Sequence, residues 1–305
     1  MTRIDLYGEE SALFTLDQIM QPLILESNAR QIAPVNASAK AEDLNTYYYK
    51  HIAAMNTKYS YEAYDSPRSE NAIQQLSQEI PAIHGELSYT VDEYRRVQRG
   101  RIGMDARAVQ LAKRFGQEES RILLAGDSDT GITSVSTTGT NSTNAETEFN
   151  TLSFANIHTT LTSLIGQLIT NGIDVGKKAL FGVATSDVYK NAMGRLNTDQ
   201  NKNGVQWINE ILQTHGGPGS KLFMDDNLGG VWSGTAGRKT LTAGTTNFCL
   251  FTYDPEIYEV VASPLERRNN GFHAIDGFHE QWVERFVPIF KEKLGIIYSG
   301  TVGNA

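Results

Sequence analysis

The chain has 305 residues, of which 40% are hydrophobic and 20% charged, and its formal net charge is −8. This composition is typical of a globular protein with one large domain or two ordinary ones, and it excludes disorder along the whole chain. The acidic balance argues against broad binding to nucleic acid or anionic membranes, because no basic excess is available to neutralise phosphates. No apolar run reaches the roughly 18 residues of a membrane span and no signal peptide is evident, so we expect an intracellular protein with no membrane partner.

Two features precede the central part of the sequence. Residues 11–25 have a helical apolar pattern that Pro22 interrupts, which favours an arm that docks on another surface over a core element. In residues 29–35, Ala-Arg-Gln-Ile-Ala-Pro-Val, Pro34 restricts the preceding residue to extended backbone. We therefore expect the start of a strand there.

The next region has the pattern of a long hairpin. Residues 46–65 are rich in tyrosine, a β-compatible side chain, and in residues 80–91 Leu87 and Tyr89 alternate with polar residues as a half-buried strand requires. Residues 57–78 are nearly devoid of aliphatic side chains and cannot bury a core of their own. Because two isolated strands are marginal in water, the pattern predicts a projecting hairpin that gains its stability from a partner.

The most regular element is a helix predicted over residues 104–127. Asp105 can cap its start, because a short acceptor side chain satisfies amide donors that have no partner within the helix. Gly126 can take the left-handed conformation that closes the last turn. The helix would be about 30 Å long, and we expect a strut rather than a pocket wall. Its apolar stripe consists of Ala108, Leu111, Ala112, Phe115, Ile122 and Leu123, and its polar surface of Arg107, Lys113, Arg114, Gln117, Glu118 and Arg121.

The second half of the chain begins at the clearest boundary, residues 127–150, whose Ser, Thr, Gly and Asn content predicts a loop. An α/β unit and then a series of strands follow, so the predicted fold class is α+β. Pro288 is expected to end the penultimate strand, and Cys249 to be a buried small hydrophobe. We expect helices at 153–170, from a cap at 185–187 onward, and at 205–213; strands at 178–184, 221–224, 247–253, 257–261, 280–287 and 293–298; and glycine-rich loops at 215–220 and 229–244.

No motif carries catalytic chemistry in the context that it needs. Ser128 completes a Gly-Asp-Ser like that of one hydrolase class, but it follows a helix rather than a strand. Residues 225–227, Asp-Asp-Asn, lack the spacing of a calcium loop, and a turn is the better interpretation. The glycine-rich residues 229–237 lack the Gly-Lys-Ser/Thr ending of a phosphate loop. We expect no catalytic, cofactor or metal site, since no two histidines have the roughly three-to-five spacing of helical metal ligands: His51, His84, His158, His215, His273 and His279.

One basic cluster stands out in this acidic chain, and it consists of Arg95, Arg96, Arg99, Arg101 and Arg107. The planar fork of donors in arginine suits either a phosphate or a carboxylate. Because the chain as a whole is acidic, we favour pairing with acidic residues of a neighbouring protein over contact with nucleic acid.

In the order of its elements, the sequence resembles the major capsid proteins of tailed phages, which share the Hong Kong 97 (HK97-like) fold with the encapsulin nanocompartments. Three stretches carry the resemblance. Residues 29–35 precede the hairpin, residues 87–94 (Leu-Ser-Tyr-Thr-Val-Asp-Glu-Tyr) lead to the long helix, and residues 121–126 (Arg-Ile-Leu-Leu-Ala-Gly) end it, followed by Gly131 and Ile132.

The resemblance implies an organisation and a function. The chain would self-assemble as hexamers and pentamers into an icosahedral shell around the viral double-stranded DNA, which it would hold without sequence specificity. It would be found in the virion after assembly in the host cytoplasm, with scaffolding, portal and decoration proteins as partners. The implied parts are an N-arm (1–41), an extended loop or E-loop (42–85), a peripheral domain (86–150 and 256–288) with the long helix as its spine, and an axial domain (151–255 and 289–305).

Some residues of the implied loop and its base are expected to contact neighbouring subunits: Tyr59, Tyr61, Tyr64, Arg68, Arg95, Arg99 and Arg101. Lys50 and Lys58 lie in or near the loop, but no asparagine and glutamate can be matched to them, so we do not predict the isopeptide cross-link of some family members.

Two alternatives remain open at this stage. The first is an encapsulin-type shell, which has the same fold and encloses enzymes in place of DNA. The second is a soluble α/β hydrolase that uses Ser128 or the carboxylates at 225–227. Gene neighbours would separate the two kinds of shell, and the size of the assembled particle would separate a shell from an enzyme.

Overall fold

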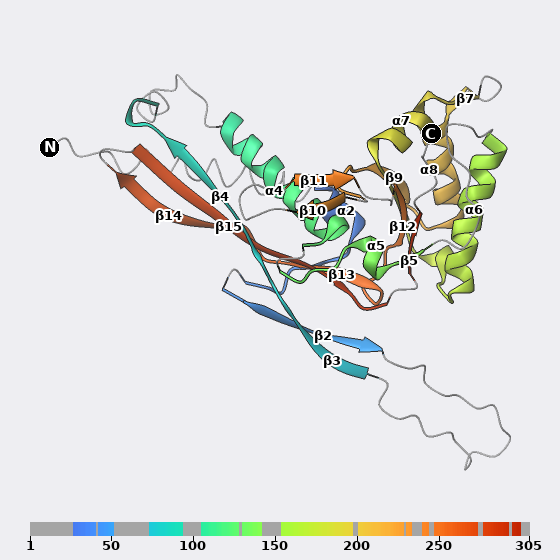
Figure 1. Cartoon of the computed structure of the whole chain (residues 1–305), viewed down its shortest axis with the longest axis horizontal. Helices are drawn as coiled ribbons and strands as arrows, with labels where there is room; N and C mark the ends of the chain where they lie inside the picture. Colours follow the sequence, from blue (N-terminus) through green and yellow to red (C-terminus); the bar gives the residue numbers. More distant parts are fainter. Residues whose placement is uncertain are drawn as a thin grey trace, which may run out of the picture.

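The structure is a computed structural model, and it contains two main β-sheets joined by several segments of the chain (Figure 1). One sheet is built around the long strand β15 and the other around the central strand β12, and we call them the β15 sheet and the β12 sheet. The structure describes residues 27–40, 42–51, 73–93, 105–127, 130–141, 154–197, 201–228, 230–233, 240–243, 247–273, 277–292 and 295–299.

The longest strand, β15 (Gly277–Phe290), organises the first sheet. β13 (Tyr258–Ala262) and β14 (Glu266–His273) follow one another antiparallel along one side of β15, and β4 (Ala82–Tyr89) pairs antiparallel with its other side. β1 (Val35–Asn36) adds to β13 in parallel. Inward-facing β4 side chains are more buried than their outward-facing neighbours, as the alternation in the sequence predicted.

Pro288 does not end its strand, contrary to the prediction, because β15 continues to Phe290. Pro288 lies opposite Val260 of β13, and the N–H of Val260 points away from β15 and donates to the carbonyl of Pro34. This is therefore a pair without ladder hydrogen bonds, where the missing N–H of a proline costs nothing. The strand tolerates the proline because of its register.

The second sheet has β12 (Phe248–Thr252) at its centre, and all five β12 residues are buried, as the apolar run predicted. Burial raises the pKa of the Cys249 thiol well above its ordinary value, which leaves it a protonated small hydrophobe. Helices pack against this sheet around a second hydrophobic core. The strand order is β5 (Thr140–Asn141), β16 (Ile296–Ser299), β12, β6 (Leu180–Ala184) and β9 (Lys221–Met224), and the helices are α6 (Phe154–Thr170), α7 (Ser186–Gly194) and α8 (Gly204–His215).

The long helix α4 (Asp105–Ala125) occupies the predicted span, and Gly126 follows it with a φ of +70°. Its apolar stripe packs on β4 so closely that a Cβ atom at Gly85 would lie 2.6 Å from Leu111 Cδ1. Arg121, predicted at the surface, is buried and pairs with Glu118 at 2.6 Å. Helix α4 contacts several other elements, including α2 (Asn28–Ile32) and α5 (Val135–Thr138).

The predicted hairpin is present, but one of its strands differs from the prediction. β2 (Asn45–His51) pairs antiparallel with β3 (Ile73–Glu79), and the two strands extend away from both sheets (Figure 1). The alternating segment after Pro81 is β4 and belongs to the β15 sheet instead. The polar β3 therefore forms the return strand of the hairpin.

Shorter elements lie where the sequence predicted other structure. Helix α2 occupies most of the segment where a strand was expected to start, but Ala33 is extended before Pro34 as predicted and β1 begins at Val35. Helix α5 and strand β5 lie within the predicted 127–150 loop. The predicted 229–244 loop contains a strand pair, β10 (Gly230–Ser233) with β11 (Thr240–Ala243). A second small pair is β7 (Leu196–Asn197) with β8 (Lys202–Asn203). The helical pattern at 11–25 lies outside the described residues.

Substitution of Gly126 tests how the spine helix ends. A Cβ at Gly126 would lie 2.6 Å from the backbone oxygen of Ile132, whereas one at Gly131, which has a φ of +71°, would meet nothing within 4 Å. Gly131→Ala should therefore cost only the strain of a left-handed alanine, about 1–2 kcal/mol, and Gly126→Ala should cost distinctly more. Urea unfolding of both variants measures the difference. Equal losses in free energy of unfolding would contradict the close packing after α4.

Candidate assembly surfaces

The β2–β3 hairpin presents two tyrosines to solvent. Successive side chains of a strand point to opposite faces, so Tyr47 and Tyr49 share one face and Tyr48 lies on the other. Tyr47 and Tyr49 are 68% and 62% exposed, while Tyr48 packs against the main hydrophobic core. Across the hairpin, Tyr47 lies opposite Ser77 and Tyr49 opposite Gln75. The outer face of the hairpin is thus an exposed surface of aromatic rings and small polar groups.

This hairpin has little within the described chain to stabilise it. Within the described residues, β2 and β3 form a sheet of their own with no third strand. The β3 sequence, Ile-Gln-Gln-Leu-Ser-Gln-Glu, supplies few apolar side chains to bury. Since an isolated two-stranded sheet is marginal in water, and exposed tyrosines are typical of interface cores, the outer face has the properties of a surface that becomes covered.

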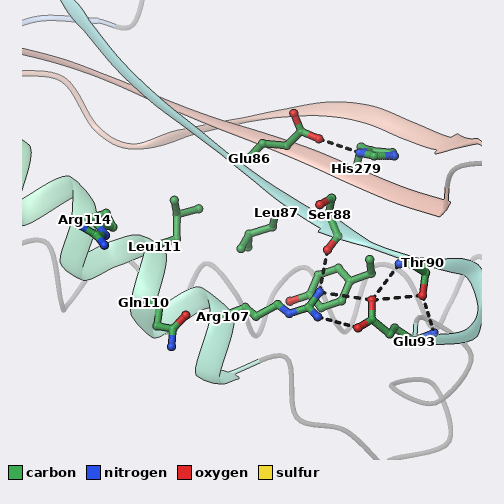
Figure 2. A pocket seen from close by; sticks show the side chains of 11 residues that line it. Glu86, Leu87, Ser88, Thr90, Glu93, Arg107, Gln110, Leu111, Arg114 and His279 are labelled. Carbon is green, nitrogen blue, oxygen red and sulfur yellow. Dashed lines mark hydrogen bonds and ion pairs between the residues drawn. The ribbon is translucent and has the colours of Figure 1, made fainter. Parts of the chain in front are cut away.

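A cavity of about 630 Å³ lies between β4 and the first turns of α4 (Figure 2). Leu87 and Leu111 supply its apolar lining, and α4 is therefore a cavity wall as well as the predicted strut. The other lining is mostly polar and includes Glu86, Ser88, Thr90, Gln110, Arg114 and His279. Glu86 of β4 and His279 of the neighbouring strand β15 form a pair at the side of this cavity, with 2.7 Å between Glu86 Oε1 and His279 Nδ1 (Figure 2).

Arg107 of α4 also lines this cavity, and it is bonded to residues at and just after the end of β4. Its Nη2 lies 2.7 Å from Glu93 Oε1, its Nη1 donates to the Ser88 carbonyl at 2.8 Å, and its guanidinium lies 4.8 Å from the centre of the Tyr89 ring. The hydrogen bond from Arg107 is the main cause that lowers the pKa of Glu93. This arginine of the basic cluster is thus engaged within its own chain.

Buried charged side chains join helix α2 to α4 and β15. Ser27 caps α2, and its hydroxyl donates to Glu119 of α4. Arg30 of α2 lies 2.7 Å from Glu119 Oε1 and also pairs with Glu284 of β15. Both carboxylates are fully buried and the Arg30 side chain is 10% exposed. Because a buried charge is costly without a partner, Arg30 fixes α2, α4 and β15 to one another.

The Glu119 carboxyl gives this contact a pH dependence. Burial raises the pKa of Glu119 above its ordinary value of 4.5, although Arg30 and Ser27 act to lower it. A carboxyl with a raised pKa in the folded state contributes most stability below its unfolded pKa, and this contribution is lost as the pH rises through the folded pKa. The contribution of Glu119 to the free energy of unfolding should therefore fall with rising pH above 4.5, and Glu119→Gln should remove this contribution from the pH dependence of stability.

Urea unfolding at a series of pH values measures this slope for the wild type and for Glu119→Gln. Glu42→Gln, which removes an exposed carboxylate, is the matched control and should keep the wild-type slope. A Glu119→Gln variant with the wild-type slope would show that Glu119 does not titrate in this range.

All seven predicted contact residues, Tyr59, Tyr61, Tyr64, Arg68, Arg95, Arg99 and Arg101, lie outside the described residues. The structure adds Tyr47 and Tyr49, whose alternation with Tyr48 in the sequence is the signal that could have indicated an exposed aromatic face. It also adds Glu119, which falls four residues after Phe115 and three before Ile122 and so lies on the apolar stripe of α4.

The alternative chemistry finds little support in the described part of the chain. The Asp225 carboxylate accepts hydrogen bonds from the Asn227 backbone and side chain at 3.0 and 2.9 Å and from Asn28 at 3.1 Å, which confirms the turn predicted after β9. Ser128 lies outside the described residues. Where the chain is described, no three His, Cys, Asp or Glu side chains gather as metal ligands, and no helix is both long and apolar enough to cross a membrane.

No protein-family model and no curated protein sequence matches the chain. Its structure, in contrast, matches proteins that build capsids and virus-like particles, over nearly the whole chain. It is similar to the virus-like particle from Pyrococcus furiosus at 13% identity and a TM-score of 0.57, covering 96% of this chain and 98% of that one. It is also similar to the capsid of Myoviridae phage XM1 at 13% identity and a TM-score of 0.59 (90% and 91% covered), and to the capsid of the empty GTA particle at 12% identity and a TM-score of 0.60 (90% and 90% covered).

These likenesses define the fold. The chain has the α+β fold of phage capsid proteins, and the predicted HK97-like architecture is confirmed. Each of the three matches includes nine tenths or more of both chains.

Proposed function

We propose that the chain is the major capsid protein of a tailed phage and that it self-assembles into an icosahedral shell around double-stranded DNA. The observation that carries this proposal is the projecting hairpin with its exposed Tyr47 and Tyr49. Aromatic side chains are enriched at protein interfaces, and a shell subunit covers such a surface with the next copy. The likeness to capsid folds supports the same conclusion.

The mechanism of assembly is geometric. In the proposed assignment, residues 1–41 are the N-arm, 42–85 the E-loop, and the β15 and β12 sheets the cores of the peripheral and axial domains. Arm and loop extend over adjacent copies, so each subunit buries more than the roughly 1,600 Å² of a standard interface. Many modest contacts then add up to a stable shell, because a subunit held at several places rebinds before it escapes.

Contacts between copies are proposed in the hairpin and at its base. Tyr47 and Tyr49 join the residues expected from the sequence. An aromatic ring buries a large area with little loss of side-chain freedom, and arginine forms paired hydrogen bonds with carboxylates. The full proposed set is Tyr47, Tyr49, Tyr59, Tyr61, Tyr64, Arg68, Arg95, Arg99 and Arg101.

The proposed partners follow from this function. Copies of the chain form hexamers and pentamers in the shell, and scaffolding, portal and decoration proteins are further candidate partners. Assembly takes place in the host cytoplasm and the product is found in the virion. The net charge of −8 favours enclosure of DNA without tight binding to it, because a broad basic surface is absent from the composition.

An encapsulin-type shell is the second candidate. The observation in its favour is the likeness to the virus-like particle from Pyrococcus furiosus, which covers more of both chains than the phage capsids do. Neighbouring genes for a portal and a terminase would support the phage capsid, and a neighbouring gene for a cargo enzyme would support the encapsulin. A soluble hydrolase would elute in size-exclusion chromatography as a small protein, far from either shell.

Replacing the exposed tyrosines tests the role of the hairpin. The double substitution Tyr47→Ser and Tyr49→Ser should leave the subunit folded, since both side chains are mostly exposed, and should abolish or strongly reduce closed particles. Gln74→Ser changes an exposed side chain of the same hairpin and is the matched control. Electron microscopy counts the particles and circular dichroism checks the fold. Normal particles from the double variant would contradict the proposed role of these tyrosines.

A deletion tests the loop beyond the hairpin. Residues 73–79 pair with β2, so a deletion confined to 57–72 removes the polar loop and leaves both strands in place. We expect a folded monomer or capsomer that fails to close shells, because the contacts across neighbouring copies are lost. Sedimentation velocity distinguishes capsomers from shells. Recovery of wild-type shells from the deletion variant would rule out a bridging role for this loop.

A further inference from the structure

The chain crosses from the β12 sheet to the β15 sheet through residues 253–257, and it returns through the segment that joins β15 to β16. These two crossings are bonded to each other. The backbone N–H groups of Lys291 and Glu292 both donate to the Ile257 carbonyl, at 2.8 and 2.9 Å. A Cβ at Gly295 would lie 2.5 Å from the Ile257 side chain, so the two segments are also in close contact. We call residues 253–257 with Lys291, Glu292 and Gly295 the junction.

Lys178, which lies next to the β12 sheet, forms an ion pair with the junction. Lys178 precedes β6, and its ammonium pairs with the Asp254 carboxylate. The side chain of Asp254 is 6% exposed, and its other oxygen accepts from the Glu256 N–H at 3.0 Å. The Tyr253 N–H donates to the Ala179 carbonyl at 2.8 Å beside this pair. The start of the first crossing is thereby fixed to β6.

Lys291, which directly follows β15, forms a hydrogen bond with the first crossing of the junction. The Lys291 ammonium lies 2.9 Å from Glu259 Oε1 of β13 and donates to the Pro255 carbonyl at 2.9 Å. The side chains of Lys291 and Glu259 are 19% and 14% exposed. Most exposed ion pairs contribute little, but the carboxylates of these two pairs are shielded from solvent, although the Lys178 side chain is 33% exposed. Removing one partner would leave a carboxylate that is both desolvated and unpaired.

From this arrangement we propose that the Lys178–Asp254 ion pair and the Lys291 ammonium, which lies between Glu259 and the Pro255 carbonyl, hold the two sheets at one fixed angle. Lys178 fixes the crossing next to β6 of the β12 sheet, and Lys291 fixes it to the β15 sheet through the Pro255 carbonyl. If the proposed function holds, the inference deepens it: the angle between the sheets sets the curvature at which copies meet, because a small angular change in each subunit is repeated around a closed shell.

A distance measured between α4, which packs on the β15 sheet, and α8, which packs on the β12 sheet, tests the angle between the two sheets. Two labelling sites, Lys113→Cys on α4 and Gln213→Cys on α8, are exposed, and the native Cys249 is buried and should not react. Double electron–electron resonance on the spin-labelled full chain, diluted with unlabelled protein, gives the intramolecular distance distribution. We expect one narrow peak in the otherwise wild-type chain and a shifted or broadened distribution when Lys178→Met and Lys291→Met are combined.

The controls separate a change of angle from a loss of fold. Lys202→Met removes a more exposed lysine–glutamate pair, with Glu210, that lies away from the junction, and it should keep the narrow peak. If the double lysine variant fails to fold, Lys291→Gln with Glu259→Gln removes the second pair without leaving a buried charge, and it should still broaden the distribution. An unchanged distance distribution in the folded junction variants would overturn the inference.

A second measurement keeps this inference distinct from the proposed function. Particle diameters from electron microscopy should shift or spread in the junction variants and should not change in Lys202→Met. Wild-type protein that forms no particles would contradict the proposed function while the distance distribution still decided the inference. Particles of wild-type diameter from variants with a broadened distance distribution would show that the junction does not control curvature.

Discussion

Arg30, buried between Glu119 and Glu284, is the contact on which the rest of the body depends. It comes from a five-residue helix that could not be stable alone, since short helices are marginal in water. The two carboxylates come from the spine helix and from the longest strand, so one guanidinium joins three parts of the chain that are far apart in sequence. Its removal would leave two desolvated carboxylates, which is more costly than losing a surface ion pair.

The other main elements are connected to this Arg30 contact. The spine helix is held against β4, where Gly85 allows close approach, and against β15 through Glu284 and Arg30. The hydrogen bonds of the junction then connect the β15 sheet to the β12 sheet. A body fixed in this way can present a hairpin with little support of its own, in which Tyr48 packs against the main core. The hairpin is left to find its stability on another copy, which is the physical basis of the proposed shell.

Much of the fold was predictable from the sequence because its main elements have strong local signals. The long helix had a regular stripe and a glycine at its end, β12 had a continuous apolar run, and α6, α8 and β9 lie where the sequence predicted them. Pro288 was misinterpreted because its effect depends on register, which a single strand does not reveal. α2 was missed because its stability comes from Ser27 and Arg30 contacts with distant residues. β3 was missed because its polar side chains resemble a loop until its pairing with β2 is known.

The candidate surfaces were predictable to a smaller extent. The sequence indicated a tyrosine-rich hairpin, and the exposure of Tyr47 and Tyr49 agrees with that, but only the packing of Tyr48 against the main core shows which rings face outward. Glu119 could have been found as a charge on an apolar stripe. Its two partners could not, because nothing in the local sequence links residue 119 with residues 27 and 30. The junction lysines likewise owe their role to tertiary contacts rather than to any motif.

Electron microscopy of the purified full-length chain is the most direct test of the central claim that this protein builds a closed shell. The account predicts closed particles of uniform diameter, assembled from many copies through the hairpin and its loop. A chain that stays a small, monodisperse species at every concentration and salt condition, with no particles or capsomers in the micrographs, would contradict it.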